Sequence, residues 1–297
     1  MEIIEVGPRD GLQNEAVTVT TEAKLEYVER LVASGLQRIE TVSFAHPTRV
    51  PQMADAEAVM ASVVRPEGVS HIGLVMNDRG MSRAIDAGVD EANVVLVASE
   101  TFSQRNQGAG IAETLAMFEA GAVRASGAGL SVTATIGAAF GCPFEGEVPT
   151  SRVQEIARHA AAAGAQEIAL ADTIGVGVPN DVERLVAAVR EVTDLPLRLH
   201  LHNTRNTGYA NAIKAVEVGV DFLDSSSGGI GGCPFAPNAT GNVATEDLAY
   251  LLGRSGVELD LDRELLLEST AFICGALGIE APALLGRAGW FPVQSGN

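Results

Sequence analysis

The chain has 297 residues, of which 46% are hydrophobic and only 4% aromatic, and its formal net charge is −18. A charge this negative argues against nucleic acid or an anionic membrane as the main partner, because both require a basic surface. Three cysteines are too few for a secreted disulfide scaffold, and the acidic start of the chain does not resemble a signal peptide. No run of about 18 apolar residues predicts a membrane span. We therefore expect a cytoplasmic globular protein.

Short apolar segments rich in β-branched residues alternate with amphipathic segments of helical periodicity. Glycines stand where four of the helices should end, because glycine readily takes the left-handed conformation that closes a helix: Gly35, Gly88, Gly164 and Gly219. The predicted strands are 2–6, 37–44, 70–76, 92–98, 130–136, 167–171, 197–202 and 221–225. The predicted helices are 21–34, 53–64, 78–87, 111–126, 151–163, 180–192, 207–218 and 245–253, with one or two more over 259–279.

Eight strand–helix units in about 250 residues predict a closed (β/α)₈ barrel of the α/β class. The alternative is a doubly wound open sheet, which usually has about five or six strands and a glycine-rich phosphate turn after the first strand. The segment 7–14 (GPRDGLQN) is not such a turn. Because no linker or low-complexity tract is visible, we predict one domain over 1–297, with the barrel over about 2–253 and closing helices over about 259–279.

Polar residues gather at the predicted carboxyl ends of the strands, where barrels of this class build their active sites. Arg9 and Asp10 follow the first strand, Glu40 lies in the second, and Asp172 follows the sixth. We expect these side chains to meet at the mouth of the barrel.

His200 and His202 lie two residues apart in the seventh predicted strand, so their side chains point to the same face, toward the barrel interior. Two imidazoles placed in this way can share a divalent metal ion, and Asp10 could add a carboxylate from across the mouth. The structural alternatives are two satisfied core histidines and, for Asp10, a turn residue before Gly11.

The segment 224–242 is rich in glycine and contains Cys233. It is either an ordinary flexible loop, a backbone cradle for phosphate, or a lid that brings a thiol into the site as nucleophile or acid. Cys142 lies in a similar Gly-Cys-Pro-Phe sequence and is a competing candidate, whereas Cys274 falls in an apolar helix and should belong to the core.

The chain has only two lysines, Lys24 and Lys214, and both fall within predicted helices. A Schiff-base aldolase needs a lysine that projects into the barrel, so that mechanism is disfavoured. If the enzyme makes or breaks a carbon–carbon bond, a metal ion must polarise the substrate oxygens instead.

Several long motifs in the same order resemble the 3-hydroxy-3-methylglutaryl-CoA lyase family, which is related to the isopropylmalate and homocitrate synthases. The match runs over about residues 2–253. It rests on 5–15 (EVGPRDGLQNE), 39–44 (IETVSF), 50–53 (VPQM), 141–146 (GCPFEG), 172–177 (DTIGVG), 229–236 (GIGGCPFA) and 240–247 (TGNVATED).

This resemblance implies a metal-dependent lyase that cleaves 3-hydroxy-3-methylglutaryl-CoA to acetyl-CoA and acetoacetate, working as a homodimer on an acyl-CoA. It implies a divalent ion, Mg²⁺ or Mn²⁺, with no nucleic-acid or membrane partner. The implied metal ligands are Asp10, His200, His202 and Asn242. The implied catalytic residues are Arg9 at the thioester carbonyl, Asp10, Glu40 and Asp172 around metal and substrate, His200 as base and Cys233 as proton donor. The expected substrate-binding residues are Arg9, Gln13, Asn203 and Arg205.

The chain departs from the typical family sequence at two places. Asn203-Thr-Arg-Asn206 replaces Asp-Thr-Tyr-Gly, and Gly137-Ala138 replaces Ser-Cys, so the acyl group stays open. Arg205 could bind a carboxylate or phosphate, and the CoA phosphates could meet Arg49 and Arg105. The alternatives are a lyase for a related 3-hydroxyacyl-CoA such as citramalyl-CoA, a Claisen-type synthase, and a non-enzymatic barrel with a broken site.

Overall fold

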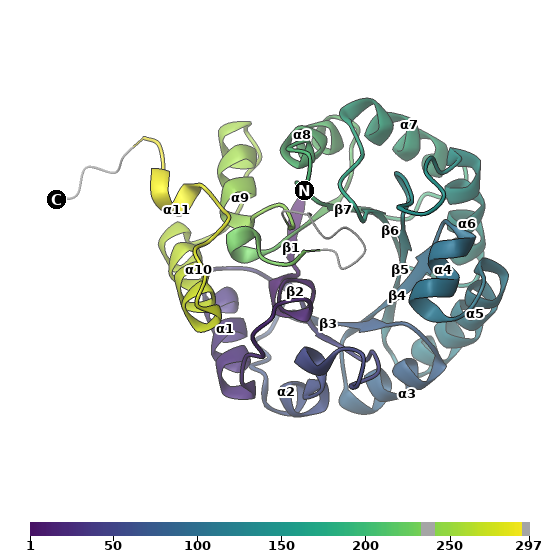
Figure 1. The fold of residues 1–297 in the computed structure, drawn as a ribbon, viewed down its shortest axis with the longest axis horizontal. Coiled ribbons are helices and arrows are strands. Elements are labelled where there is room, and N and C mark those ends of the chain that lie inside the picture. Colours follow the sequence, from purple (N-terminus) through teal and green to yellow (C-terminus); the bar gives the residue numbers. More distant parts are fainter. Residues whose placement is uncertain (233–240, 293–297) are drawn as a thin grey trace.

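The computed structural model describes residues 1–232 and 241–292. Eight parallel strands form a closed barrel in which each strand pairs with its neighbours in chain order and β8 pairs with β1. Helices surround this barrel (Figure 1). The strands are β1 (Glu2–Glu5), β2 (Arg38–Ser43), β3 (Ser70–Val75), β4 (Glu91–Val97), β5 (Ser131–Gly137), β6 (Glu167–Asp172), β7 (Leu197–Leu201) and β8 (Phe222–Ser225).

The outer helices follow the strands in the order expected of a (β/α)₈ barrel, so the predicted fold class is confirmed. The α-helices are α1 (Thr21–Ala33), α2 (Ala56–Ser62), α3 (Asp78–Ala87), α4 (Glu100–Gln107), α5 (Ile111–Gly127), α6 (Thr150–Ala162), α7 (Pro179–Arg190), α8 (Gly208–Glu217), α9 (Thr245–Arg254), α10 (Arg263–Leu277) and α11 (Leu285–Ala288). Three short helical turns are η1 (Gly7–Gly11), η2 (Pro51–Met53) and η3 (Ser227–Gly229).

All eight predicted strands are present, and the predicted helices are confirmed with small shifts at their ends. The four glycines expected at helix ends have φ between 67° and 100°, in the left-handed region. The sequence did not predict α4, whose polar residues carry little helical periodicity but whose amino end is capped by Ser99. The region 259–279 forms a single helix, α10, which packs beside α1, and α11 was not predicted (Figure 1).

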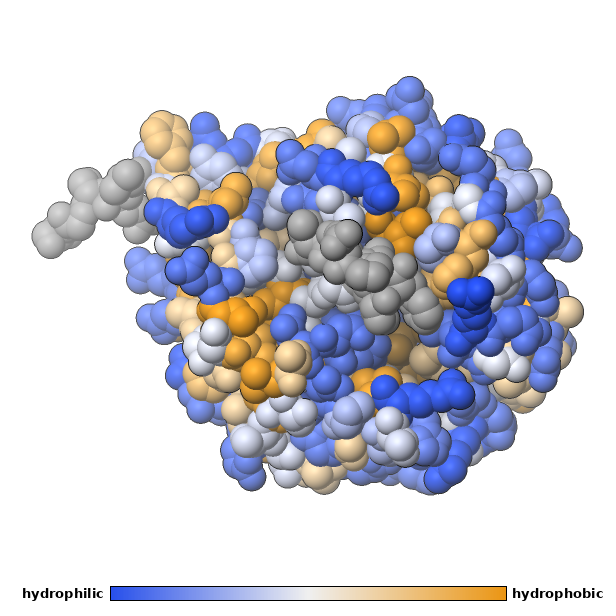
Figure 2. All heavy atoms as spheres, viewed as in Figure 1, coloured by the Kyte–Doolittle hydropathy of each residue, from blue (hydrophilic) through white to orange (hydrophobic). Residues whose placement is uncertain are grey.

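The main hydrophobic core lies between the strands and the surrounding helices. Inside the barrel, a smaller apolar layer joins Ile4, Val6, Ile72 and Phe222. Figure 2 shows the molecular surface in the same view as Figure 1. This face is mostly hydrophilic, with hydrophobic residues in separate patches. Among the described residues, no helix has the length and apolar character needed to cross a membrane.

A layer of charged residues closes the amino-terminal end of the barrel interior; we call it the floor layer. Arg38 lies 2.5 Å from a carboxylate oxygen of Glu91 and 3.0 Å from one of Glu167. Arg198, which is fully buried, donates to both carboxylate oxygens of Asp224. These ion pairs join β2, β4, β6, β7 and β8 across the barrel, at the end opposite the mouth.

Candidate active site

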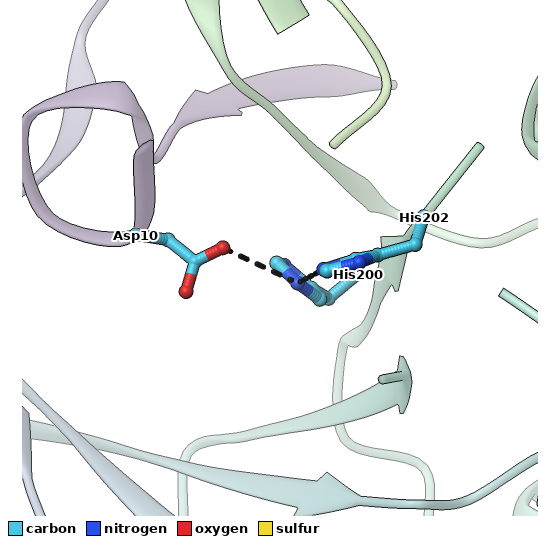
Figure 3. A group of neighbouring side chains, drawn as sticks. All are labelled: Asp10, His200 and His202. Carbon is cyan, nitrogen blue, oxygen red and sulfur yellow. Dashed lines mark hydrogen bonds and ion pairs between the residues drawn. The ribbon is translucent and has the colours of Figure 1, made fainter. Parts of the chain in front are cut away.

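Three ligand-type side chains meet at the mouth of the barrel. Asp10 lies on η1, His200 lies on β7, and His202 follows it directly. Their ligand atoms all lie within 4.8 Å of one another (Figure 3). The Nε2 atoms of the two imidazoles are 3.0 Å apart, and His200 Nε2 is 3.8 Å from Asp10 Oδ2. The predicted convergence of these residues is therefore present, and we call them the mouth cluster.

Asp224 fixes the ring of His200 on the side away from the cluster, because Asp224 Oδ2 lies 3.0 Å from His200 Nδ1. Burial opposes protonation of His200, but Asp224 and Asp10 outweigh it and raise its pKa. Desolvation and the neighbouring His200 lower the pKa of His202 to about 4. A neutral imidazole is the form that binds a metal, and a carboxylate behind a ligating histidine is the usual means of fixing its ring.

Asn242 completes the cluster from the far side of the glycine-rich loop. Its Nδ2 donates to Asp10 Oδ2 at 2.9 Å and to the carbonyl of Ile230 at 3.1 Å. Within the described parts of the chain, Asn242 Oδ1 and His202 Nδ1 are buried without a hydrogen-bond partner. A buried amide oxygen beside two imidazoles and a carboxylate is a donor set that suits a divalent ion, so the residues present fit a metal.

Arg9 is the cation nearest to this cluster. Its guanidinium contacts Asp10 Oδ1 at 2.5 Å, and its Nε donates to Glu40 Oε2 at 2.8 Å. Burial alone would lower the pKa of Arg9, but the Glu40 and Asp10 carboxylates raise it, so the charge is retained. The Arg9 guanidinium and the imidazoles likewise outweigh the burial of Asp10 and hold its pKa well below the usual range. Arg9 is thus a fixed positive charge at the edge of the cluster.

Two further residues hold Glu40 in place. Asn93 donates to Glu40 Oε1 at 2.7 Å, and Thr135 donates to Asn93 Oδ1 at 2.6 Å. Sequence analysis missed Asn93, Thr135 and the supporting Asp224. Each stands at an inward position of its strand, two residues from another polar residue, and this alternation was the available signal.

A cavity of about 170 Å³ lies over the mouth cluster and Arg9. Gln13 lines it, as a substrate-binding residue should. Asn203 and Arg205 line a separate cavity, and Arg205 Nη1 donates to the carbonyls of Ile174 and Gly175. Substrate contact by Gln13, Asn203 and Arg205 therefore remains a prediction, and only Gln13 is placed in the main cavity.

Asp172 lies at the end of β6, where it is buried and organises the following loop. Its carboxylate accepts the backbone N–H groups of Val176 and Gly177, each at 2.9 Å. Burial raises its pKa against the effect of these hydrogen bonds. A direct part in catalysis, as opposed to this loop contact, stays a prediction for Asp172.

The cysteines occupy three different settings. Cys233 lies outside the described residues, although Gly232 before it lines the main cavity. Cys142 is buried with its Sγ 2.9 Å from Ser99 Oγ, and does not line that cavity. Cys274 is buried in α10 as predicted, and burial raises the pKa of its thiol to about 11.

Four other basic residues that the sequence analysis named do not line the main cavity. Lys24 and Lys214 lie on α1 and α8, as predicted. Arg49 is exposed after β2, and Arg105 lies on α4 with its guanidinium 4.1 Å from the centre of the Phe144 ring. Phosphate binding by either arginine remains a prediction.

The HMGL-like family model matches residues 1–273. The chain belongs to this family. It is 43% identical to the (R)-citramalyl-CoA lyase of Chloroflexus aurantiacus, over 97% of this chain and 94% of that protein. It is 40% identical to the mitochondrial hydroxymethylglutaryl-CoA lyase of Bos taurus, over 93% of this chain and 86% of the relative.

Solved structures agree with this family membership. A Bacillus subtilis HMG-CoA lyase superimposes with a TM-score of 0.94 at 37% identity and covers 97% of each chain. An HMG-CoA lyase from Acinetobacter baumannii, in complex with coenzyme A and 3-methylmalate, superimposes with a TM-score of 0.95 at 35% identity, covering 100% of this chain and 97% of that one. The family resemblance is confirmed, and the chain is an HMG-CoA lyase-like carbon–carbon lyase.

Proposed function

We propose that this family member is a divalent-metal-dependent lyase that cleaves 3-hydroxy-3-methylglutaryl-CoA to acetyl-CoA and acetoacetate. The observation that carries the proposal is the meeting of Asp10, His200 and His202 with the buried Arg9 at one cavity. This places a metal-ligand set beside a fixed cation, which is what carbon–carbon cleavage next to a thioester requires.

The proposed ligands of the ion are Asp10, His200, His202 and Asn242, and their mixed oxygen and nitrogen atoms suit Mg²⁺ or Mn²⁺. When bound, such an ion supplies Lewis-acid activation that lowers the pKa of the tertiary hydroxyl of the substrate. A weakly basic carboxylate then suffices to accept the hydroxyl proton.

His200 cannot be both ligand and base, because Nδ1 is held by Asp224 and only Nε2 faces the cluster. We therefore propose that His200 binds and orients the ion, and that the hydroxyl proton leaves the substrate through Asp10. The role of base, which the family resemblance assigned to His200, thus passes to Asp10, and both residues remain in the site.

Arg9 would stabilise the negative charge that develops on the thioester oxygen as the C2–C3 bond breaks. The bonding pair of electrons passes to the enolate of acetyl-CoA, and the oxygen that lost its proton becomes the ketone of acetoacetate. Cys233 is the proposed donor of the proton that converts the enolate to acetyl-CoA. A preorganised cation of this kind contributes roughly 3–4 kcal/mol to a transition state.

A second candidate substrate is citramalyl-CoA, whose cleavage gives acetyl-CoA and pyruvate. Two comparisons favour it: the relative at 43% identity is a citramalyl-CoA lyase, and the Acinetobacter enzyme holds 3-methylmalate, a five-carbon hydroxydicarboxylate. The two thioesters differ by one methylene between the tertiary carbon and the free carboxylate. The same metal ligands and the same Arg9 serve either substrate.

The test is acetyl-CoA release from both thioesters in the presence of Mg²⁺, with wild type, Cys233→Ala and the matched control Cys142→Ala. We expect release by wild type and by Cys142→Ala, and a strong loss for Cys233→Ala. Faster release from citramalyl-CoA would select the second substrate. No release from either thioester by folded, metal-loaded wild type would contradict the proposed function.

A further inference from the structure

The two sides of the active-site cavity differ in charge. The side formed by η1, β7 and β8 carries Arg9, Asp10, His200, His202 and Asp224. The side formed by β3, β4 and β5 is uncharged and carries Leu74, Met76, Asn93, Val95, Val97, Thr135 and Gly137. If the reacting hydroxyl and thioester lie at the charged side, the other substituents of the tertiary carbon must face the uncharged side.

Within that uncharged side, we define the acyl wall as Asn93, Val95, Thr135 and Gly137. These residues come from the paired strands β4 and β5, in which Val95 is opposite Thr135 and Val97 is opposite Gly137. Asn93 is 2% exposed and is tied to both Thr135 and Glu40 by hydrogen bonds. These hydrogen bonds hold Asn93 and Thr135 in place, and the strand pairing fixes Val95 and Gly137 beside them.

Gly137 is the one position of the acyl wall without a side chain, and nothing in its surroundings requires a glycine. A Cβ added there would lie 3.4 Å from the carbonyl of Leu96 and 3.8 Å from Thr173 Oγ1, which are ordinary contacts. Its φ is not in the left-handed region. Gly231 differs, because its φ is +95° and an added Cβ would lie 2.8 Å from the backbone of Asp10.

We propose that Gly137 is a specificity-determining residue that gives the cavity room for the carboxylate-bearing chain of the substrate. The inference rests on the proposed lyase function and names the substrate class more closely. It assigns to this enzyme the 3-hydroxy-3-methyl acyl-CoAs whose free carboxylate is separated from the tertiary carbon by one or two methylenes. A single added methyl at residue 137 occupies space that the longer chains need and the shortest does not.

The experiment compares three thioesters of increasing length: citramalyl-CoA, 3-hydroxy-3-methylglutaryl-CoA and 3-hydroxy-3-methyladipyl-CoA. The enzymes are wild type, Gly137→Ala, Gly137→Val and the control Gly275→Ala, which lies in α10 with no atom within 4 Å of the added Cβ. The readouts are kcat/KM for each thioester, Mn²⁺ affinity and melting temperature.

Wild type should cleave the longest thioester, and Gly137→Ala should lower its kcat/KM about 10-fold relative to citramalyl-CoA, since one methylene in a pocket is worth ~10–200-fold. Gly137→Val should extend this loss to 3-hydroxy-3-methylglutaryl-CoA. Mn²⁺ affinity should stay at the wild-type value in both variants, and neither should lose melting temperature. Gly275→Ala should match wild type in kcat/KM and Mn²⁺ affinity, with an equal or higher melting temperature because alanine favours a helix over glycine.

Two results would overturn the inference while leaving the lyase function intact. One is wild type that cleaves citramalyl-CoA alone, and the other is a Gly137→Ala variant whose three kcat/KM values are unchanged or fall in equal proportion. Folded, metal-loaded wild type that cleaves none of the thioesters would instead contradict the proposed function, and the inference with it.

Discussion

The floor layer and the mouth cluster both bury charged groups inside the same barrel, but they satisfy them differently. In the floor layer, Arg38 lies between two carboxylates and Arg198 is bonded to both oxygens of Asp224. The remaining nitrogen, Arg198 Nη1, has no hydrogen bond among the described residues but lies 3.7 Å from the Glu167 carboxylate. In the mouth cluster, two imidazole nitrogens face each other, and Asn242 Oδ1 has no partner among the described residues. Paired charges indicate a structural role, whereas ligand-type atoms that face each other at a cavity form a site that could hold an ion.

The largest expected effect is on stability, from breaking the floor layer. Arg198→Met leaves the buried Asp224 carboxylate without the guanidinium that donates to both of its oxygens, so the free energy of unfolding should fall by ~3–5 kcal/mol. Chemical denaturation measures this. Arg184→Met, at an exposed position of α7, is the control and should change little. If the free energy of unfolding of Arg198→Met fell by less than about 1 kcal/mol, the ion pairs of the floor layer would not be a main source of stability.

Arg9→Lys tests the mouth cluster, where we expect a loss of activity without a loss of stability. Lysine keeps a positive charge beside Glu40 but lacks the planar guanidinium whose N–H groups should donate to the thioester oxygen. The kcat should therefore fall by a factor of ~10²–10³. The melting temperature should stay close to wild type because the charge is retained. An unchanged kcat would remove Arg9 from the reaction, and a loss of activity that follows the loss of folded protein would make it structural.

Glu246 extends the comparison of the two regions, because its carboxylate is buried and pairs with no cation in the described part of the chain. It accepts hydrogen bonds from the Gly228 backbone and the Thr270 hydroxyl, and burial raises its pKa from 4.5 to about 7. Between these two pH values the unfolded chain loses this proton while the folded chain keeps it. The free energy of unfolding should therefore fall as pH rises through this window, by ~3 kcal/mol in total.

Glu246→Gln should remove this part of the pH dependence, measured by denaturation at pH 4.5, 6 and 8. The exposed Glu155→Gln is the matched control and should keep the wild-type slope. If Glu246→Gln and wild type have parallel pH profiles, the carboxylate is ionised in the folded protein, and burial without a cation is tolerated there.

The smallest effect on the mouth cluster should come from Asp224, which contacts both Arg198 and His200, so its replacement should also lower the melting temperature through the floor layer. Asp224→Asn should weaken Mn²⁺ binding by ~10–100-fold, since a carboxylate behind a ligating histidine orients the ring. Mn²⁺ titration followed by electron paramagnetic resonance measures this. Unchanged Mn²⁺ affinity with a lower melting temperature would assign Asp224 to the floor layer alone.

The sequence predicted the barrel well because its strands and helices repeat with clear periodicity and glycines mark the helix ends. It also predicted that Asp10, His200 and His202 would meet, since strand ends share one edge of the barrel. It could not predict α4, whose helix depends on a cap and on packing. The alternation of Asn93 and Thr135 with other polar residues marked them as inward-facing, but their roles depend on contacts between strands that are distant along the chain.

The most direct test of the account is metal dependence at the mouth cluster. Wild-type protein stripped of metal should release no acetyl-CoA from either thioester, and Mg²⁺ or Mn²⁺ should restore release with one bound ion per chain. His202→Ala should stay inactive after the same addition, while His159→Ala, on α6, should recover like wild type. Full activity of the stripped protein, or wild-type metal binding by His202→Ala, would contradict the central claim.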